Sequence, residues 1–290
     1  MANVYLTKQI DSEGLQKAYD ALGVKLPGKV AVKISTGEPG GHNFLQPTLI
    51  APLVQALDGT IVECNTGYPG KRSTSAAHWE TIRAHGFSNI APCDILDEEG
   101  ELSLPVHGGR YLKENYVGDH IKRYDSMLML SHFKGHMMGG FGGALKNMSI
   151  GLASSRGKLW IHSAGTAFDM TKAFSTEQNS FLASMAEADS AVMEYMGREN
   201  ILYVNVANRL SVDCDCDSNP KEPEMADIGI LASTDPVALD QACVDLVYAS
   251  PDSGKAALIE RMESRNGIHT VETAEKMGLG SRNYTLVGLD

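Results

Sequence analysis

The sequence predicts an α/β fold in which helices flank a mostly parallel sheet and two lobes surround a cleft. Short apolar runs with the length of buried strands alternate with segments whose apolar residues recur at helical spacing. Between residues 29 and 85 the order of strand, loop and helix repeats, which is typical of parallel sheets with right-handed crossovers. Polar, glycine-bearing loops follow three expected strands, at the sheet edge where ligands usually bind.

Local signals place the elements of the first lobe. Asp11 or Ser12 can cap the first helix, and Pro47 suits the first turn of the second. Residues 89–111 are rich in Pro and Asp, which predicts a small antiparallel excursion or flap. Strands are expected at residues 3–7, 29–34, 60–65 and 126–130, and helices at residues 12–22, 47–57, 73–85 and 144–152.

The second lobe is expected to contain more helix. Asp235 or Thr234 can cap a helix that has Pro236 at its first position. We therefore divide the chain into an N-terminal lobe, residues 1–155, with the glycine-rich site loops, and a C-terminal lobe, residues 156–290, although the two could pack as one continuous domain. The remaining strands are expected at residues 201–206, 227–232 and 284–287, and the helices at residues 176–196, 236–248, 253–264 and 270–277.

Composition excludes several classes of protein. Hydrophobic residues at 43% and charged residues at 21% indicate a globular chain rather than a disordered one. The net charge of −11 argues against nucleic acid as a partner, because binding to phosphates needs clustered Lys and Arg. No apolar run reaches the ~18 residues of a membrane span, and residues 1–10 lack the apolar core of a signal peptide. We therefore expect a cytoplasmic protein without membrane contact, whose five cysteines are reduced thiols.

The stretch from Ser131 to Asn147 carries the strongest functional signal. It combines two imidazoles, two ammonium groups and four closely spaced glycines after an expected strand. Lys146 would lie in the first turn of the next helix, where it opposes the helix dipole, so a ligand explains it better than stability does. His132 and His136 have the spacing of a helical zinc site, but Gly135 between them disfavours a helix. A purely structural glycine turn stays open as an alternative.

Two other loops carry cations and glycines, at residues 35–44 and 65–73. If the strand ends share one edge, their polar side chains face a common crevice, although any single one could be a solvated surface residue. Imidazole titrates near neutrality and suits acid–base chemistry. The catalytic candidates are therefore His136, His132 and Lys146, and the candidates for binding an anionic substrate are Lys71, Arg72, His42, Gly140, Gly142, Gly143 and Asn147.

Residues 211–217 place two thiols and three carboxylates close together. In an extended segment Cys214 and Cys216 project to the same side, where two thiolates can bind a soft metal. Zinc sites usually have two residues between such cysteines, so a capped turn with buried thiols stays open. The metal-ligand candidates are Cys214, Cys216, Asp213 and Asp215.

The chain resembles the uncharacterised DUF362 family, whose members are often labelled iron–sulfur centre proteins. Many members carry a ferredoxin-like insert with C-x-x-C-x-x-C runs, but this chain has no cysteine between Cys93 and Cys214. A four-iron ferredoxin cluster is therefore not expected. The matching segments are HFKGH at residues 132–136, GFGGALKN at 140–147, DCDC at 213–216, DIGILAS at 227–233, DPVALD at 235–240 and AEKMGLGS at 274–281.

A more distant resemblance is to lactate racemase, which holds a nickel-pincer nucleotide covalently. His136 precedes Lys146 by the interval found between a His and a Lys of that family. The resemblance implies a lactate-racemase-like fold, a proton-transfer role for His136, and a cofactor or anion anchor at Lys146. The sequence departs from the family at Gly37, where the family has Arg, and near Pro92 and Cys93, where it has paired catalytic histidines.

The favoured hypothesis is an enzyme that binds a small anionic substrate or cofactor in a cleft between the lobes, with acid–base chemistry that depends on a divalent metal or a metallated nucleotide. The alternative is a metal or redox carrier without turnover, related to iron–sulfur proteins. A third hypothesis is a binding protein that lost its cluster. The substrate, the reaction and homo-oligomer formation stay open. Metal analysis of anaerobically purified protein would separate the hypotheses.

Overall fold

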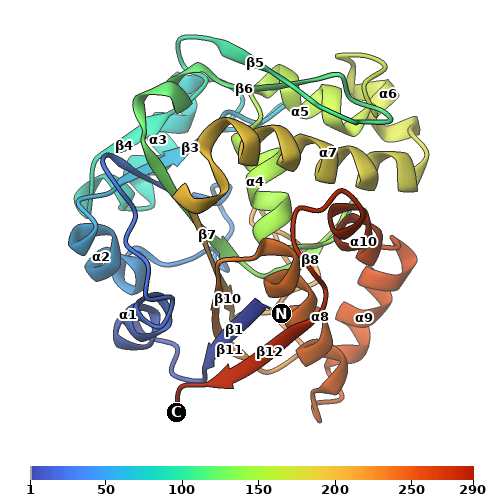
Figure 1. Cartoon of the computed structure of the whole chain (residues 1–290). Helices are drawn as coiled ribbons and strands as arrows, with labels where there is room; N and C mark the ends of the chain where they lie inside the picture. Colours follow the sequence, from blue (N-terminus) through green and yellow to red (C-terminus); the bar gives the residue numbers. More distant parts are fainter. Residues whose placement is uncertain (1) are drawn as a thin grey trace.

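An eight-stranded sheet runs through the computed structural model, which describes residues 2–290 (Figure 1). The strand order is β12-β1-β11-β10-β7-β2-β3-β4, and only β11 runs antiparallel to its neighbours. The predicted α/β fold with a mostly parallel sheet is therefore confirmed. The strands are β1 (Ala2–Thr7), β2 (Val30–Lys33), β3 (Thr60–Glu63), β4 (Cys93–Ile95), β7 (Ser126–His132), β10 (Ile201–Ala207), β11 (Gly229–Ser233) and β12 (Tyr284–Gly288).

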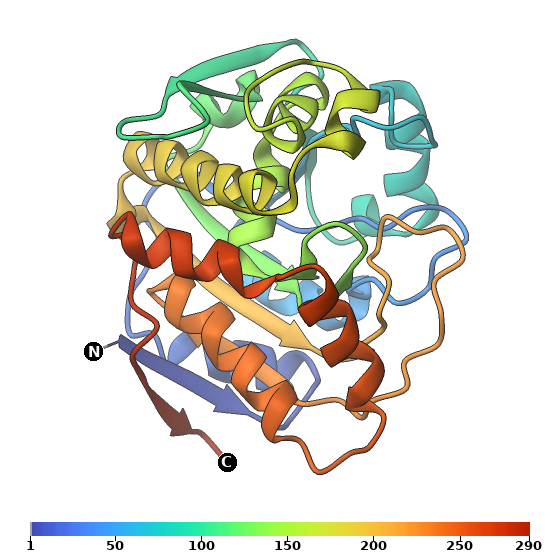
Figure 2. The same cartoon turned by 90° about the vertical axis from the view of Figure 1, so that its right-hand side faces the viewer.

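Helices cover both faces of the sheet, as Figures 1 and 2 show. On one face α1 (Ser12–Asp20), α2 (Pro47–Ala56) and α3 (Ser75–Ala84) bury their apolar sides against one core cluster. A larger cluster lies on the other face, where burial of apolar side chains against central strands drives the packing. Its helices include α4 (Ala144–Leu152), α5 (Ser155–His162), α7 (Gln178–Met196), α8 (Pro236–Ala249), α9 (Lys255–Ser264) and α10 (Ile268–Lys276).

Two small antiparallel pairs stand outside the main sheet. The expected excursion is found as β5 (Glu101–Pro105) paired with β6 (Glu114–Gly118). It begins later than predicted, because β4 instead joins the edge of the main sheet, parallel to β3. The glycine-rich stretch folds as a hairpin of β8 (Lys134–His136) and β9 (Gly140–Gly142). Short helices complete the chain: α6 (Met170–Ser175), η1 (Phe87–Asn89), η2 (Asp119–Arg123) and η3 (Arg198–Asn200).

The sheet is continuous across the two expected lobes. Strand β7, from the first, is hydrogen-bonded along its length to β10, from the second. The division at residue 155 stays a prediction. No helix among residues 2–290 combines the length and the apolar character needed to cross a membrane.

Candidate functional site

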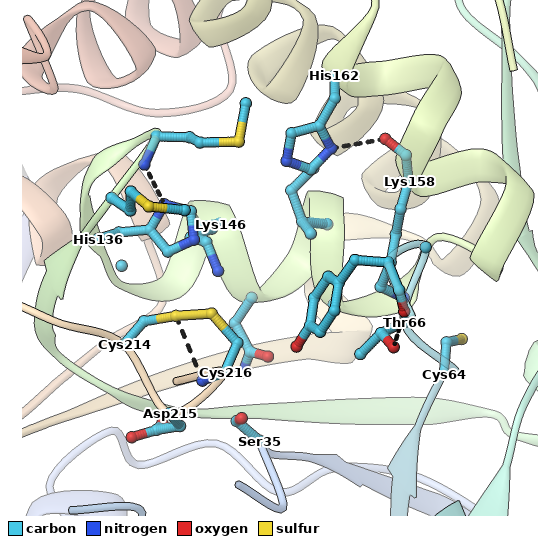
Figure 3. Close-up of a pocket in the computed structure, with 18 of the residues that line it drawn as sticks. Ser35, Cys64, Thr66, His136, Lys146, Lys158, His162, Cys214, Asp215 and Cys216 are labelled. Carbon is cyan, nitrogen blue, oxygen red and sulfur yellow. Dashed lines mark hydrogen bonds between the residues drawn. A yellow bond between two sulfur atoms is a disulfide. The ribbon is translucent and has the colours of Figure 1, made fainter. Parts of the chain in front are cut away.

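A cavity of about 270 Å³ lies where three parallel strands end (Figure 3). Lys33, Glu63 and His132 are the last residues of β2, β3 and β7, and all three line it. The hairpin β8–β9, helices α4 to α6 and residues 214–216 supply other parts of the wall. The volume is close to the lower end of ~300–1,000 Å³ that is usual for ligand sites, so the cavity suits a small molecule.

Different structural constraints require glycine at different positions of the hairpin and just after it. Gly140 has a φ of 80°, a conformation that glycine adopts without steric strain, and it does not line the cavity. A Cβ atom on Gly143 would lie only 2.3 Å from Oδ1 of Asp240. Asp240 accepts hydrogen bonds from the first amides of α4, those of Ala144 and Leu145. These amides are therefore bonded to a carboxylate of the chain itself and are not available to bind a ligand. Gly142 and Gly143 do line the cavity.

Lys146 extends into the cavity from the first turn of α4 (Figure 3). Among residues 2–290 its ammonium group has no hydrogen-bond or ion-pair partner. Burial, with a smaller effect of the charge on Lys134, lowers the pKa of Lys146 to about 7. A lysine in this setting can hold an anion when protonated and can exchange a proton near neutral pH.

Two further lysines in the cavity were not expected from the sequence. Lys33 donates to the carbonyl of Ile34 at 2.6 Å and to Oδ1 of Asn147 at 3.1 Å. Burial lowers the pKa of Lys33 to about 8, although the charge of Glu63 works against the shift. Lys158 donates to the carbonyl of Ala153 at 2.6 Å. Neither lysine forms an ion pair with a carboxylate of the described residues. A lysine at the end of an apolar strand was the available signal for Lys33.

Arg72 lines the cavity with its guanidinium group already paired. It contacts Glu38 at 2.6 Å, Glu63 at 2.9 Å and the hydroxyl of Tyr68 at 3.2 Å. Burial works to raise the pKa of Glu63, but Arg72 and His78 hold this pKa well below its usual value. The Arg72 side chain therefore joins two strand-end loops and has little free charge to offer a ligand.

His42 and Lys71, which were expected at the same crevice, lie outside the cavity. The His42 ring contacts Glu222 at 2.8 Å with 49% of its side chain exposed. Lys71 is exposed, and its backbone amide donates to Glu38. Of the predicted site residues, the structure brings to the cavity Arg72, His132, His136, Gly142, Gly143, Lys146, Asn147, Cys214, Asp215 and Cys216.

His132 lies between two hydrogen-bond partners that contact its two ring nitrogens. Its Nδ1 lies 2.8 Å from a carboxylate oxygen of Asp215, and its Nε2 lies 2.7 Å from the carbonyl of Asn208. Both partners are hydrogen-bond acceptors, and together they fix the orientation of the ring. Lys134 also pairs with Asp215, at 2.9 Å. Burial works to raise the pKa of Asp215, but His132 and Lys134 outweigh it and lower that pKa.

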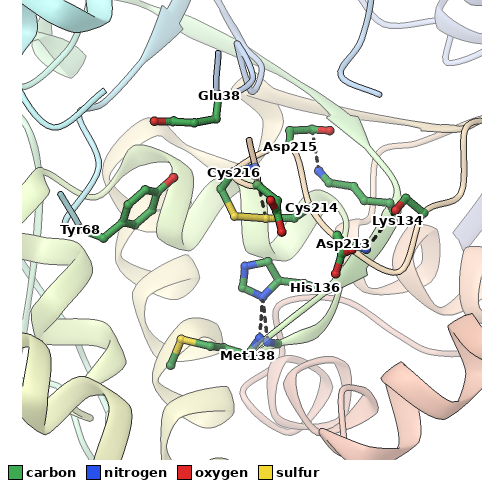
Figure 4. Close-up of a disulfide and its surroundings, with 12 residues drawn as sticks. Glu38, Tyr68, Lys134, His136, Met138, Asp213, Cys214, Asp215 and Cys216 are labelled. Carbon is green, nitrogen blue, oxygen red and sulfur yellow. Dashed lines mark hydrogen bonds and ion pairs between the residues drawn. A yellow bond between two sulfur atoms is a disulfide. The ribbon is translucent and has the colours of Figure 1, made fainter. Parts of the chain in front are cut away.

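The imidazole ring of His136 is neutral. Its Nδ1 accepts hydrogen bonds from the amides of Met138 and Gly139, at 3.3 and 2.8 Å. The neutral ring therefore carries its proton on Nε2, which faces the sulfur atoms of Cys214 and Cys216 (Figure 4). Burial, with the charge of Lys146 as the next cause, holds the pKa of His136 well below its usual value.

His162 on α5 is a further titratable group that the sequence did not indicate. Its Nδ1 donates to the carbonyl of Lys158 at 2.6 Å, which leaves Nε2 as an acceptor. The ring stacks on Phe181 with 4.6 Å between centroids, and the residue lines the cavity. Burial lowers the pKa of His162 to about 4. The cavity thus contains one neutral imidazole that donates and one that accepts.

Cys214 and Cys216 form a disulfide, so the expectation of five reduced thiols is wrong for this pair. The segment is a turn rather than an extended strand, and the amide of Cys216 donates to the sulfur of Cys214 at 3.3 Å. The turn brings together the sulfurs of two cysteines that have one residue between them. The other three cysteines, Cys64, Cys93 and Cys243, are free thiols.

The carboxylates beside the disulfide point away from its sulfurs (Figure 4). Asp213 contacts Arg261 at 3.5 Å, and Asp215 pairs with His132 and Lys134. A ring nitrogen of His136 and the two sulfurs lie within 4.8 Å of one another, so these three atoms are the potential metal-ligand atoms that lie closest together here. Metal binding by Cys214, Cys216, Asp213 and Asp215 stays a prediction.

Comparisons with known proteins identify one family. The model of a domain of unknown function, DUF362, matches residues 30–245. No curated protein matches the chain. The lactate racemase apoprotein from Thermoanaerobacterium thermosaccharolyticum is 11% identical with a TM-score of 0.49, over 85% of this chain and 57% of that one. A structural genomics target from Thermotoga maritima is 14% identical with a TM-score of 0.41, over 91% of this chain and 58% of that one. The chain thus spans less than two thirds of either protein.

Proposed function

This chain belongs to the DUF362 family, whose function is unknown, and we propose that it is an enzyme that binds a small anion in the cavity and transfers protons there. The observation that carries the proposal is the unpartnered ammonium group of Lys146. A buried cation is unfavourable without a counter-charge, and an anionic ligand supplies one.

The charges around Lys146 favour an anion over a cation. Lys33 and Lys158 add two ammonium groups that make no ion pair, although the chain as a whole carries a net charge of −11. The acidic residues of the cavity wall, Glu63 and Asp215, are already paired with cations. An anion that enters the cavity therefore meets uncompensated positive charge, at a depth where water screens it poorly.

The two neutral histidines place a hydrogen-bond donor and a hydrogen-bond acceptor in the same cavity as Lys146. Nε2 of His162 has a free lone pair and can accept a hydrogen bond or a proton, whereas the Nε2–H group of His136 can donate a hydrogen bond to negative charge that develops on a ligand. Lys146, with a pKa of about 7, can take part in either direction. A group that titrates near neutral pH, with a hydrogen-bond donor and an acceptor in the same site, is an arrangement that suits general acid–base catalysis.

The residues that line the cavity also favour one class of cofactor over another. A phosphorylated cofactor would find counter-charges in Lys33, Lys146 and Lys158. A hard divalent metal needs oxygen ligands, and the carboxylates of the described cavity wall are occupied by ion pairs. These residues therefore suit a phosphate group better than a magnesium or calcium ion.

Calorimetry with the Lys146→Ala variant tests the proposal, with inorganic phosphate, malonate and citrate as probes. We expect the wild type to bind at least one of these anions, and the variant to bind it roughly 10- to 100-fold more weakly, because a hydrogen bond to a charged group contributes about 1.5–3 kcal/mol. Lys276→Ala is the matched control, since Lys276 is exposed on α10 and does not line the cavity.

The proposal fails if Lys146→Ala binds the anion as tightly as the wild type and the Lys276→Ala control. The acid–base part is tested separately with His162→Gln. We expect this variant to bind the anion normally and to lose turnover of any substrate identified. Weak anion binding with unchanged turnover would contradict the role of the ring.

A further inference from the structure

The disulfide between Cys214 and Cys216 opens onto the same cavity as the unpartnered lysine. The backbone around it is anchored independently of the S–S bond. The carbonyl of Asp215 accepts from the amide of Glu38 at 2.7 Å, and the carbonyl of Cys214 accepts from the amide of Asp217 at 2.9 Å. Opening the disulfide therefore leaves both thiols close together, in position to close it again.

The two sulfurs differ in accessibility. Cys214 is buried, with 6% of its surface exposed, whereas Cys216 is partly exposed. The Cys214 sulfur also accepts the amide of Cys216, at 3.3 Å. Thiol–disulfide exchange needs one sulfur that an incoming thiolate can reach and another that leaves as a stable thiolate. Cys216 fits the first role and Cys214 the second.

The surroundings stabilise a thiolate in the cavity. His136 presents its Nε2–H to the sulfurs (Figure 4), and the Lys146 ammonium group lines the same space. The negative charges of Asp213 and Asp215 are compensated by Arg261, His132 and Lys134. Nearby hydrogen-bond donors and cations are what make a cysteine reactive as a thiolate.

We propose that Cys214 and Cys216 form a reversible redox pair that reacts with a small thiol carrying a negative charge. The ligand thiolate attacks Sγ of Cys216, a new S–S bond forms between them, and the Cys214–Cys216 bond breaks to release the Cys214 thiolate. A second thiolate of the same kind attacks the ligand sulfur, and Cys216 leaves as a thiolate. The sum is one disulfide of the small thiol and a reduced pair, with two electrons transferred to the protein.

The choice of an anionic thiol rests on the proposed anion-binding function, whereas the redox pair does not. The probes are therefore 3-mercaptopropionate, which is anionic, and 2-mercaptoethanol, which is neutral. Free thiols are trapped by alkylation and located by mass spectrometry. Each rate is divided by the rate of the same thiol with a small-molecule disulfide, which removes the difference in intrinsic reactivity.

We expect alkylation of Cys214 and Cys216 only after reduction, and renewed protection when the disulfide of the probe is added. When Cys214→Ser is treated with the disulfide of the probe, the Cys216 thiolate should attack it, release one probe thiolate and accumulate as the mixed disulfide. In Cys216→Ser it should form at least tenfold more slowly on Cys214. The control Cys93→Ser, which alters a thiol outside the cavity, should behave as the wild type.

The choice of ligand is tested by the rate of exchange, normalised to that of the same thiol with a small-molecule disulfide. This normalised rate should be at least tenfold higher for the anionic thiol than for the neutral one, and Lys146→Gln should bring the ratio of the two rates towards one.

The outcomes separate the two proposals. Failure of the reduced pair to re-form its disulfide, or stoichiometric soft metal held by these thiols in the purified protein, would overturn the redox pair even if calorimetry shows anion binding. Reversible exchange without preference for the anionic thiol would overturn the choice of ligand and leave the redox pair in place. Equal attack on both cysteines would overturn the assignment of Cys216 as the entry point.

Discussion

The carboxylate of Asp240 accepts a hydrogen bond from the backbone amide of Ala144 at 2.8 Å. Asp240 lies on α8 and also accepts from the amide of Leu145 at 3.0 Å and from Nδ2 of Asn205 at 2.7 Å. Helix α4, whose own preceding residue Gly143 offers no side chain, is therefore capped from a different helix. Because Lys146 lies in this first turn, the cap also sets the position of the proposed anion anchor.

Asp240→Ala should destabilise the fold by about 2 kcal/mol, because it leaves three buried donors without their acceptor. Burial raises the pKa of Asp240 to about 6. A carboxyl group with a raised pKa contributes most stability below its ordinary pKa and loses it as the pH rises through 6. We therefore expect a larger loss at pH 5 than at pH 8 in urea unfolding. Glu260→Ala, at an exposed site on α9 without a hydrogen-bond or ion-pair partner among the described residues, should change the free energy of unfolding by less than ~0.5 kcal/mol.

Anion binding should weaken as the pH rises above neutrality. Burial lowers the pKa of Lys146 to about 7, so the protonated form that attracts an anion is lost through this range. Titration with sulfate, whose charge is constant over the range, should give an affinity roughly 30-fold lower at pH 8.5 than at pH 6, because the protonated fraction of Lys146 falls by about this factor. Lys146→Arg keeps its charge and should flatten the profile. A profile that stays steep in this variant would assign the pH dependence to another group.

Arg72→Met should destabilise the protein by about 3–5 kcal/mol in chemical denaturation, since it removes the guanidinium group from two buried carboxylates and leaves Glu38 without an ion pair and Glu63 with His78 alone. Because the pKa of Glu63 is held below its usual value, the stability that this network supplies to the wild type should be lost as the pH falls through the lowered pKa. Arg83→Met, at an exposed position of α3, is the control. Equal stability of the two variants would mean that the Arg72 network contributes little.

Asp189→Asn should stabilise the protein at alkaline pH. Both carboxyl oxygens of Asp189, on α7, are buried without a hydrogen-bond partner among the described residues. Burial, and secondarily the charge of Asp240, raises the pKa of Asp189 well above its usual value, so stability is lost as the pH rises. We expect a gain of about 1–2 kcal/mol at pH 8 that disappears near pH 4. The control, Glu194→Gln on the exposed side of α7, should show no such gain.

Local patterns were sufficient to predict most elements of the fold. The apolar spacing and flanking residues predicted a helix at residues 144–152, and the structure has α4 from Ala144 to Leu152. The apolar run at Ser126 predicted the central strand β7, which is buried on both faces. The prediction of the antiparallel excursion at residues 89–111 was less accurate in where the excursion begins, because β4 joins the main sheet by pairing with β3, which lies far from it in the sequence.

The sequence by itself determined which chemical groups follow the strands, His136, Lys146 and Cys214 among them, because strand length and glycine position are local properties. Tertiary structure alone decided how those groups are charged and paired. Arg72 is neutralised by Glu38 and Glu63, Lys146 is left without a partner, and His162 enters the cavity from α5. Pairing and burial depend on contacts between residues far apart in the chain, and these contacts leave no periodic signal in the sequence.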